Sequence, residues 1–231
     1  MNLAALAEAS EAAGLALRGA LRLEAAEQVG PLASVRSVAL FGFTGGRQWP
    51  AFTASPEAAD GRPHPLDRWS RRVLTALAEP YGATALFPSD GPPYMPFQRW
   101  AQRAEPVAPS PLGLFIHPRY GLWHSYRGAL AFGETWDIPS PEPAPSPCES
   151  CDGRPCLSAC PVGAFAPEVY AVDACASWVG RAEGRRCAET GCLARHACPV
   201  GRDYAYGPEQ ASFYMRAFVA ARGSKPAASR G

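Results

Sequence analysis

The sequence predicts an α+β protein in two parts, an amino-terminal α/β domain followed by a small cysteine-rich module. Between residues 1 and 136, segments of helical periodicity alternate with short segments of strand periodicity, which is typical of helices packed on a sheet. All eight cysteines lie instead between residues 148 and 198. Prolines at every second position from 139 to 147 separate the two parts and predict a stiff linker over 137–147.

The elements of the first part follow from their patterns. Residues 2–13 are alanine-rich and precede Gly14, which favours a short helix. Residues 15–23 alternate apolar and polar side chains, which predicts a strand with one face in water. Residues 37–43 are apolar throughout, as in a strand covered on both faces. Apolar side chains at helical spacing predict a helix over 64–80. We also expect a helix over 96–104 and strands over 83–87, 112–116 and 126–132.

The last part of the chain predicts one further helix. Pro208 is a favourable first helical residue and Gly223 a favourable stop. We therefore expect the cysteine module over 148–205, a carboxy-terminal helix over 206–222 and a disordered tail over 223–231.

Composition limits the function and the compartment. A net charge of +1 and a pI near 7.6 count against a nucleic-acid partner. No apolar run approaches the roughly 20 residues that cross a bilayer, so we expect no membrane association. Glu8 and Glu11 interrupt the first turns, so we see no secretory signal. With its cysteines reserved for metal, the protein is expected in the reducing cytoplasm.

The cysteines fall into two groups and one isolated residue. The first group reads C-x2-C-x4-C-x3-C-Pro and the second reads C-x4-C-x5-C-Pro. Cys175 stands alone between them. Closely spaced cysteines let one loop supply several soft thiolate donors to iron. Eight thiolates are enough for two four-sulfur sites.

The first group resembles the bacterial ferredoxin run C-x2-C-x2-C-x3-C-Pro, with two extra residues between Cys151 and Cys156. In that run the first three cysteines ligate one cluster and the fourth ligates the other. Carried over by order, the resemblance implies two [4Fe-4S] clusters. Cluster one would be held by Cys148, Cys151, Cys156 and Cys198, and cluster two by Cys160, Cys175, Cys187 and Cys192.

Two other uses of the cysteines remain open at this point. Two structural zinc sites would also take eight cysteines, although zinc loops usually come as tight C-x2–4-C pairs. A disulfide framework needs an oxidising compartment. The spacing, with its lone Cys175 and its two Cys-Pro ends, favours paired iron–sulfur clusters over both.

Two segments resemble related corrinoid-protein families. Residues 113–132, GLFIHPRYGLWHSYRGALAF, resemble the cobalamin-processing chaperones that remove cyanide or alkyl groups from cobalamin. The cysteine module with its VDACASW insert resembles epoxyqueuosine reductase and, more loosely, the reductive dehalogenases. The resemblance implies a nitroreductase-like, corrinoid-binding domain followed by a bacterial-ferredoxin-like module with two clusters.

The chaperone resemblance also implies a cobalamin site. His117 matches the motif histidine near the nucleotide tail, and Gly121 matches a glycine that lets backbone approach the ligand. Trp123 and Arg127 match the aromatic and basic positions. The alternative is that His117, Trp123 and Tyr126 simply cover a sheet edge. Asp90 lies where epoxyqueuosine reductase has its proton-donating aspartate, but with two extra residues before Arg99.

The sequence also departs from both families. Epoxyqueuosine reductase has a carboxy-terminal helical repeat domain that helps hold tRNA, whereas this sequence ends soon after Cys198, so we expect no tRNA substrate. The cobalamin chaperones have no clusters. We therefore expect an iron–sulfur redox protein that takes electrons from an external ferredoxin, flavodoxin or reductase and passes them to a corrinoid or related acceptor. The alternative is a ferredoxin-like electron-transfer protein whose amino-terminal domain only docks a partner.

Overall fold

The computed structural model describes residues 2–138, 141, 144–166 and 169–223 and divides the chain into two compact units. The first unit is Met1–Val107 with His124–Ala144, and the second is Ala108–Trp123 with Pro145–Gly231. Parts of the expected linker, 139–140 and 142–143, and the expected tail from 224 onward lie outside the described residues.

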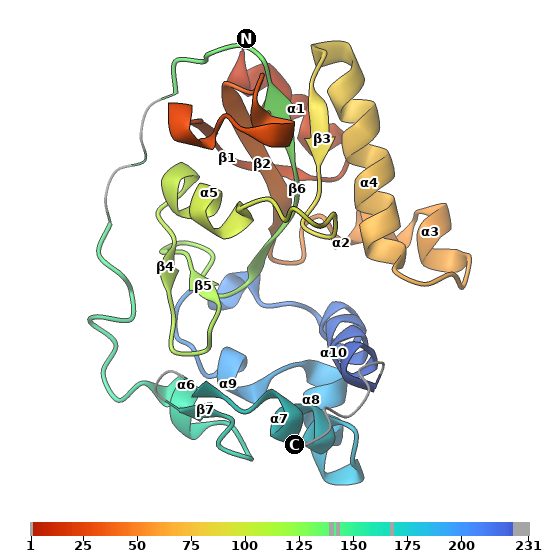
Figure 1. Cartoon of the computed structure of the whole chain (residues 1–231). Helices are drawn as coiled ribbons and strands as arrows, with labels where there is room; N and C mark the ends of the chain where they lie inside the picture. Colours follow the sequence, from red (N-terminus) through yellow and green to blue (C-terminus); the bar gives the residue numbers. More distant parts are fainter. Residues whose placement is uncertain (1, 139–140, 142–143, 167–168, 224–231) are drawn as a thin grey trace, which may run out of the picture. The chain divides into compact units, whose positions relative to one another are not determined.

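The first unit is built on a four-stranded antiparallel sheet with the order β1-β2-β6-β3 (Figure 1). The strands are β1 (Ala16–Arg22), β2 (Ser37–Thr44), β3 (Thr84–Leu86) and β6 (His124–Phe132). Helices α1, α4 and α5 pack against this sheet. The helices of this unit are α1 (Leu3–Ala12), α2 (Trp49–Thr53), α3 (Pro56–Ala59), α4 (Pro65–Ala78) and α5 (Phe97–Ala104), with short 3-10 turns at Ala25–Glu27, Gly30–Leu32 and Glu79–Tyr81.

The core of the first unit forms around its central strand. Every residue of β2 is buried, as its unbroken apolar pattern predicts. Helix α4 contributes Trp69, whose ring meets those of Phe43 and Phe52 edge-on, with centroids 5.8 and 5.9 Å apart. The helices expected over 64–80 and 96–104 and the strands expected over 37–43 and 126–132 are therefore confirmed, with ends that differ by a few residues.

Strand β1 lies where it was predicted, but the prediction that one of its faces is exposed to water is wrong. Arg18, which the alternating pattern assigns to water, is buried, and the pairing with β2 shifts between Leu17 and Gly19. The Arg18 guanidinium makes two 2.9 Å hydrogen bonds to the carboxylate of Glu105 and donates to the Phe43 carbonyl at 2.8 Å. Tyr126 donates to the same carboxylate at 2.5 Å. Burial raises the pKa of Glu105, and Arg18 and Tyr126 oppose that rise.

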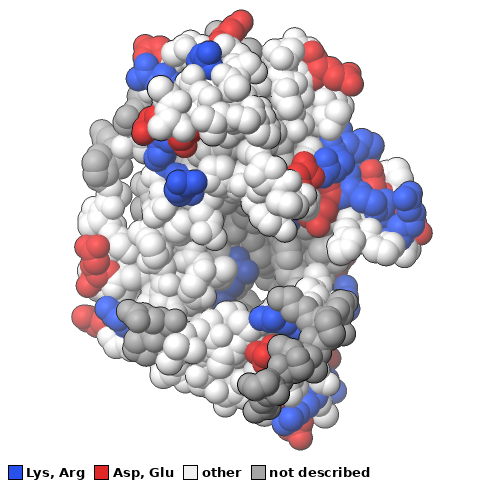
Figure 2. Space-filling view, in the orientation of Figure 1, with Lys and Arg blue, Asp and Glu red and all other residues white. Residues whose placement is uncertain are grey.

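On the surface, charges of opposite sign are paired over α3 and α4. Arg68 lies 2.7 Å from Asp60, and Arg72 lies 2.6 Å from Glu57. The hydrogen bond from Arg72 is the main cause that lowers the pKa of Glu57. Figure 2 shows these basic and acidic side chains interspersed on that face. The charges of this region are therefore compensated locally.

The second unit consists of short helices, one longer helix (α10), 3-10 turns and two-stranded ladders (Figure 1). The strands pair as β4 with β5 and β7 with β8. The helix expected after Pro208 is confirmed as α10 (Pro208–Gly223). The remaining elements are β4 (Ala108–Pro109), β5 (Phe115–Ile116), α6 (Pro155–Ser158), β7 (Phe165–Ala166), β8 (Val169–Tyr170), α7 (Val172–Val179), α8 (Arg185–Thr190) and α9 (Leu193–His196), with 3-10 turns at Ala182–Gly184 and Arg202–Tyr204.

The segment 108–123, expected within the first domain, belongs to the second unit. It buries Leu112, Ile116 and Leu122 in one apolar cluster with Ala194 and Cys198. The cysteine module is too small to cover these side chains with regular elements of its own, so an earlier segment completes its core. Within the described part of the chain, no helix is long and apolar enough to cross a membrane.

We predict that Glu105→Gln destabilises the protein strongly. The change leaves the Arg18 guanidinium in the core beside a neutral amide, and breaking a buried ion pair costs about 3–5 kcal/mol of unfolding free energy. Urea unfolding of the full chain measures the loss. The matched control is Glu11→Gln, whose long 3.9 Å contact with Arg47 is exposed, and which should change stability by less than about 0.5 kcal/mol. Equal effects of the two changes would contradict the prediction.

Candidate metal centre

Four cysteines of the second unit line one small apolar cavity. They come from four places in the chain. One lies two residues after the end of α6, one lies in α7, one lies in α8 and one directly precedes α9. Phe165, Trp178 and Val179 are among the apolar side chains of its wall. The four cysteines are Cys160, Cys175, Cys187 and Cys192.

Local hydrogen bonds are directed at these sulfurs. The backbone N–H of Ala164 donates to Cys160 Sγ at 3.3 Å. Burial raises the pKa of Cys192, and the backbone N–H groups of Arg195 and Ala194 lower it by donating to the sulfur. Burial likewise raises the pKa of Cys175, and a hydrogen bond from the Tyr170 hydroxyl opposes that rise. Each of these donors would stabilise a thiolate in a site that is otherwise apolar.

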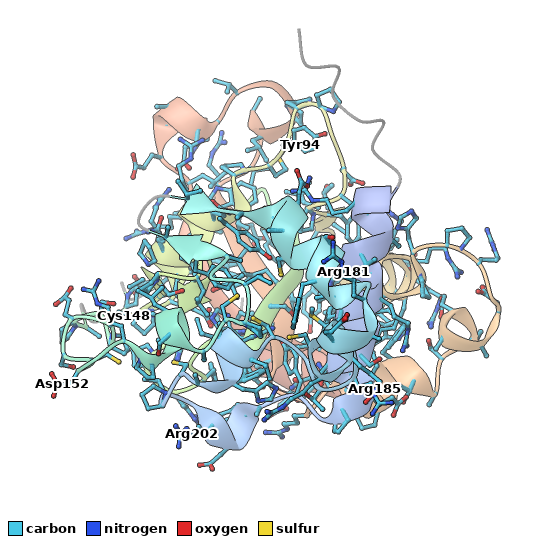
Figure 3. The ribbon with its side chains drawn as sticks, turned by 90° about the horizontal axis from the view of Figure 1, so that it is seen from below. Tyr94, Cys148, Asp152, Arg181, Arg185 and Arg202 are labelled. Atoms are coloured by element: carbon cyan, nitrogen blue, oxygen red, sulfur yellow. The ribbon has the colours of Figure 1, made fainter. Side chains whose placement is uncertain are left out.

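The other four cysteines form a second set. Burial raises the pKa of Cys148, and the neighbouring sulfurs of Cys198, Cys156 and Cys151 add to that rise. The pKa of Cys156 is raised by burial first and then by Cys198 and Cys151. Figure 3 shows Cys148 in the loop that precedes α6, with Asp152 pointing outward from the same loop. Cys198 is buried and comes from the far end of the module.

The structure thus brings together the same two sets of four cysteines that the ferredoxin resemblance implies. Soft thiolate donors in apolar surroundings fit [4Fe-4S] clusters chemically. Among the described residues, no three His, Cys, Asp or Glu side chains converge closely enough to hold a single metal ion. A cubane distributes its ligands over four iron atoms, so its sulfurs need not converge on one point. Metal ligation by these cysteines stays a prediction.

The residues implied for cobalamin binding are all engaged in contacts within their own units. His117 Nδ1 accepts the backbone N–H of Arg119 at 3.0 Å. Arg127 pairs with Asp67 in the first unit. Trp123 is 2% exposed, with its ring 5.3 Å from that of Tyr206. Their role in binding a corrinoid is untested. Asp90 pairs with Arg71 on the surface.

Gly121 has a close neighbour in its own unit. Its φ of +56° favours glycine, and a Cβ there would lie 2.0 Å from the Val200 carbonyl oxygen. Gly201, on the other side of this contact, also has a positive φ of 69°. The required backbone approach is therefore to the chain itself, just after Cys198.

Sequence reasoning missed two side chains beside the cysteines. Tyr170 lies in strand β8, and nothing in its spacing indicates a hydrogen bond to Cys175. The Arg195 guanidinium lies over the rings of both Trp123 and Tyr206, 4.5 Å from each centroid, and donates to the Leu122 carbonyl. The only sequence signal for Arg195 was its position between Cys192 and Cys198.

Comparison with known proteins identifies the fold. No protein-family model matches the chain, and no curated protein matches it. A selenomethionine-labelled epoxyqueuosine reductase is 13% identical over 91% of this chain and 68% of its own, with a TM-score of 0.57. Epoxyqueuosine reductase from Streptococcus thermophilus is 14% identical over 90% of this chain and 70% of its own, with a TM-score of 0.54. A third epoxyqueuosine reductase, with an epoxyqueuosine-modified tRNA-Tyr stem loop, is 15% identical over 90% of this chain and 70% of its own, with a TM-score of 0.54.

The chain therefore has an epoxyqueuosine reductase-like fold, which confirms that part of the resemblance seen in the sequence. At these identities the likeness extends to the fold alone. The mixture of helix and sheet in the structure agrees with the expected α+β class.

We predict that Gly121→Ala disrupts the second unit. The new Cβ would overlap the Val200 carbonyl, and alanine would have to adopt a left-handed backbone conformation. The loss of unfolding free energy should therefore exceed the roughly 1–2 kcal/mol that this conformation alone costs. The matched control is Gly113→Ala in the same segment, where φ is +70° but nothing lies within 4 Å. Both variants place alanine at a positive φ, so the difference between their urea unfolding midpoints measures the effect of the overlap with Val200. Equal midpoints would mean that the 121–201 contact is loose.

Proposed function

We propose that this protein is an iron–sulfur redox protein with two [4Fe-4S] clusters. The main support is the grouping of eight cysteines into two sets of four within one unit, in a chain with an epoxyqueuosine reductase-like fold. Cys148, Cys151, Cys156 and Cys198 would hold one cluster, and Cys160, Cys175, Cys187 and Cys192 the other. When bound, such clusters supply one-electron transfer.

The surrounding residues would set the environment of the clusters. Phe165, Trp178 and Val179 exclude water from one cysteine set, and the N–H of Ala164 and the hydroxyl of Tyr170 donate to its sulfurs. Burial lowers a cluster potential and hydrogen bonds to sulfur raise it, so these side chains have opposite effects on the ease of reduction.

As the electron acceptor we propose a corrinoid, on the resemblance of residues 113–132 to the cobalamin chaperones. The alternative is electron transfer to a partner protein without a corrinoid. A specific observation favours the alternative: Trp123 and Arg127 already have partners inside the protein, in Tyr206 and Asp67.

We predict that anaerobically prepared protein binds about eight iron atoms and an equal amount of acid-labile sulfide per chain, since each cubane holds four of each. Cys175→Ala should remove about half of the iron. Cys175→Ala combined with Cys192→Ala should remove no more, because both residues lie in one set. Cys175→Ala combined with Cys198→Ala should remove nearly all. Iron and sulfide assays with electron paramagnetic resonance of the reduced protein follow these losses.

The pairs of cysteine variants control for each other. Both double variants remove two thiols, so a difference between them reports the grouping and not the number of cysteines. If both lose all iron, the two sets are not independent sites. Zinc without sulfide in the unsubstituted protein would instead support the structural zinc alternative.

The corrinoid proposal is tested by titration. Cobalamin added anaerobically to cluster-loaded protein that has been reduced with dithionite and freed of the excess should take electrons from the clusters and change to the spectrum of its reduced form. His117→Ala should weaken the binding if this segment holds the nucleotide tail. Arg222→Ala, at the far end of α10, is the matched control. An unchanged cobalamin spectrum, together with reversible reduction of the clusters, would support the partner-docking alternative.

A further inference from the structure

A second, larger cavity lies in the second unit beside the cysteines. It measures about 420 Å³ and opens to solvent. Its wall comes from the turn between β4 and β5, from the start of α6 and from the β7–β8 hairpin. The described residues that line it are Ser110, Pro111, Leu112, Gly113, Arg154, Leu157, Ala166, Val169 and Tyr170.

Two exposed apolar side chains line this cavity, and a third follows a residue that lines it. Val169 is 60% exposed and Tyr170 is 39% exposed, and both line the cavity. Leu114 is 44% exposed and follows Gly113, which also lines it. Among the described residues of the second unit, these three are the large apolar side chains left in water. Exposed apolar side chains gathered in one place mark an interaction site.

Arg154 is the single charged side chain among the described residues of the cavity wall. It is exposed, and no carboxylate of the described chain pairs with it within 4.0 Å. Its backbone is left-handed, with φ 39° and ψ 61°. That conformation is costly for a residue with a side chain, and such strain is concentrated at functional positions. Nearby Asp152 does not line the cavity.

The patch is backed by both cysteine sets. Tyr170 stacks on Phe165 with ring centroids 4.7 Å apart, and Phe165 lines the cavity of the four cysteines. The Tyr170 hydroxyl donates to Cys175. Leu157, which lines the cavity, comes between Cys156 of one set and Cys160 of the other in the sequence and packs against the same apolar cluster as both. A molecule seated on the patch would therefore be separated from the cysteines by single side chains.

We propose that this patch, Leu114, Arg154, Val169 and Tyr170, is the docking site of a small acidic electron-carrier protein that reduces the clusters. The inference rests on the proposed function. An unpaired arginine at an apolar patch is complementary to a carrier that surrounds its redox group with carboxylates and apolar side chains. In the transfer the carrier loses one electron and this protein gains it, and no atom is exchanged.

The test uses flavodoxin hydroquinone as the probe. Stopped-flow mixing with oxidised, cluster-loaded full-length protein follows the appearance of the flavodoxin semiquinone. Loss of the charge in Arg154→Asn should lower the second-order rate constant about 3–10-fold at low salt, since charge complementarity acts mainly on association. Arg154→Lys should retain most of the rate. Asparagine is chosen because it tolerates the left-handed backbone.

A second pair of variants probes the apolar part. Val169→Asp and Leu114→Asp place like charge against an acidic carrier and should each slow the reaction by about 10-fold or more. The matched control is Arg185→Asn, an exposed arginine on α8 that pairs only loosely with Glu189 at 3.6 Å. Figure 3 shows Arg185 well apart from Cys148 and the loop before α6. This variant should stay within about twofold of the unsubstituted rate.

Direct reduction by dithionite distinguishes a failure of the proposed redox function from a failure of the docking site. Every variant should be reduced by dithionite at the unsubstituted rate and contain the same iron and sulfide. If the unsubstituted protein contains no sulfide or is not reduced by dithionite, the proposed function fails. If it is reduced but the Arg154, Val169 and Leu114 variants all react with flavodoxin as fast as it does, the docking site is wrong. Self-association that Val169→Asp abolishes, with an unchanged flavodoxin rate, would assign the patch to a second copy of this chain and overturn the proposal.

Discussion

The second unit depends on holding sulfur atoms from distant parts of the chain around two small volumes. Burial raises the pKa of thiols, as at Cys148 and Cys192, so apolar surroundings alone disfavour the thiolates that iron needs. The backbone N–H groups of Ala194 and Arg195 and the Tyr170 hydroxyl offset part of that cost. Cys192 lies directly before α9, whose first N–H groups have no partner within the helix and are free to donate to its sulfur.

The shortness of several helices in this unit explains why its core includes an earlier segment of the chain. Helices of four to eight residues, such as α6 and α7, bury too little apolar area to be stable alone. The segment 108–123 supplies the missing area through Leu112, Ile116 and Leu122. The close backbone approach at Gly121 then fixes this segment beside the loop that follows Cys198. Metal binding would add to the same free energy, because cysteine ligands from four places close several loops at once.

The sequence alone was enough to predict an element that one periodic signal determines. It was not enough to predict features that tertiary contacts determine. Strand β2 and helix α4 could be predicted because their apolar patterns are long. The burial of Arg18 could not be predicted, because its partner Glu105 lies 87 residues away and a polar residue in an alternating strand is expected to be exposed. The order of a known run implied two cysteine sets, one of which lines a single cavity, while ligation of metal by either set stays a prediction. The β7–β8 hairpin, with two residues in each strand, has no detectable period, so neither Tyr170 nor the cavity beside it was foreseen.

The motif at residues 113–132 shows how a sequence resemblance and a structural unit can disagree. The resemblance treats it as one ligand-binding stretch, whereas the division between units falls after Trp123. Trp123 is held by Tyr206 in one unit and Arg127 by Asp67 in the other, so packing and ion pairing explain these two residues without a ligand. The cysteines, their hydrogen-bond donors and the patch around Arg154 all lie in the second unit. The proposed redox chemistry can therefore be correct whether or not a corrinoid is the acceptor.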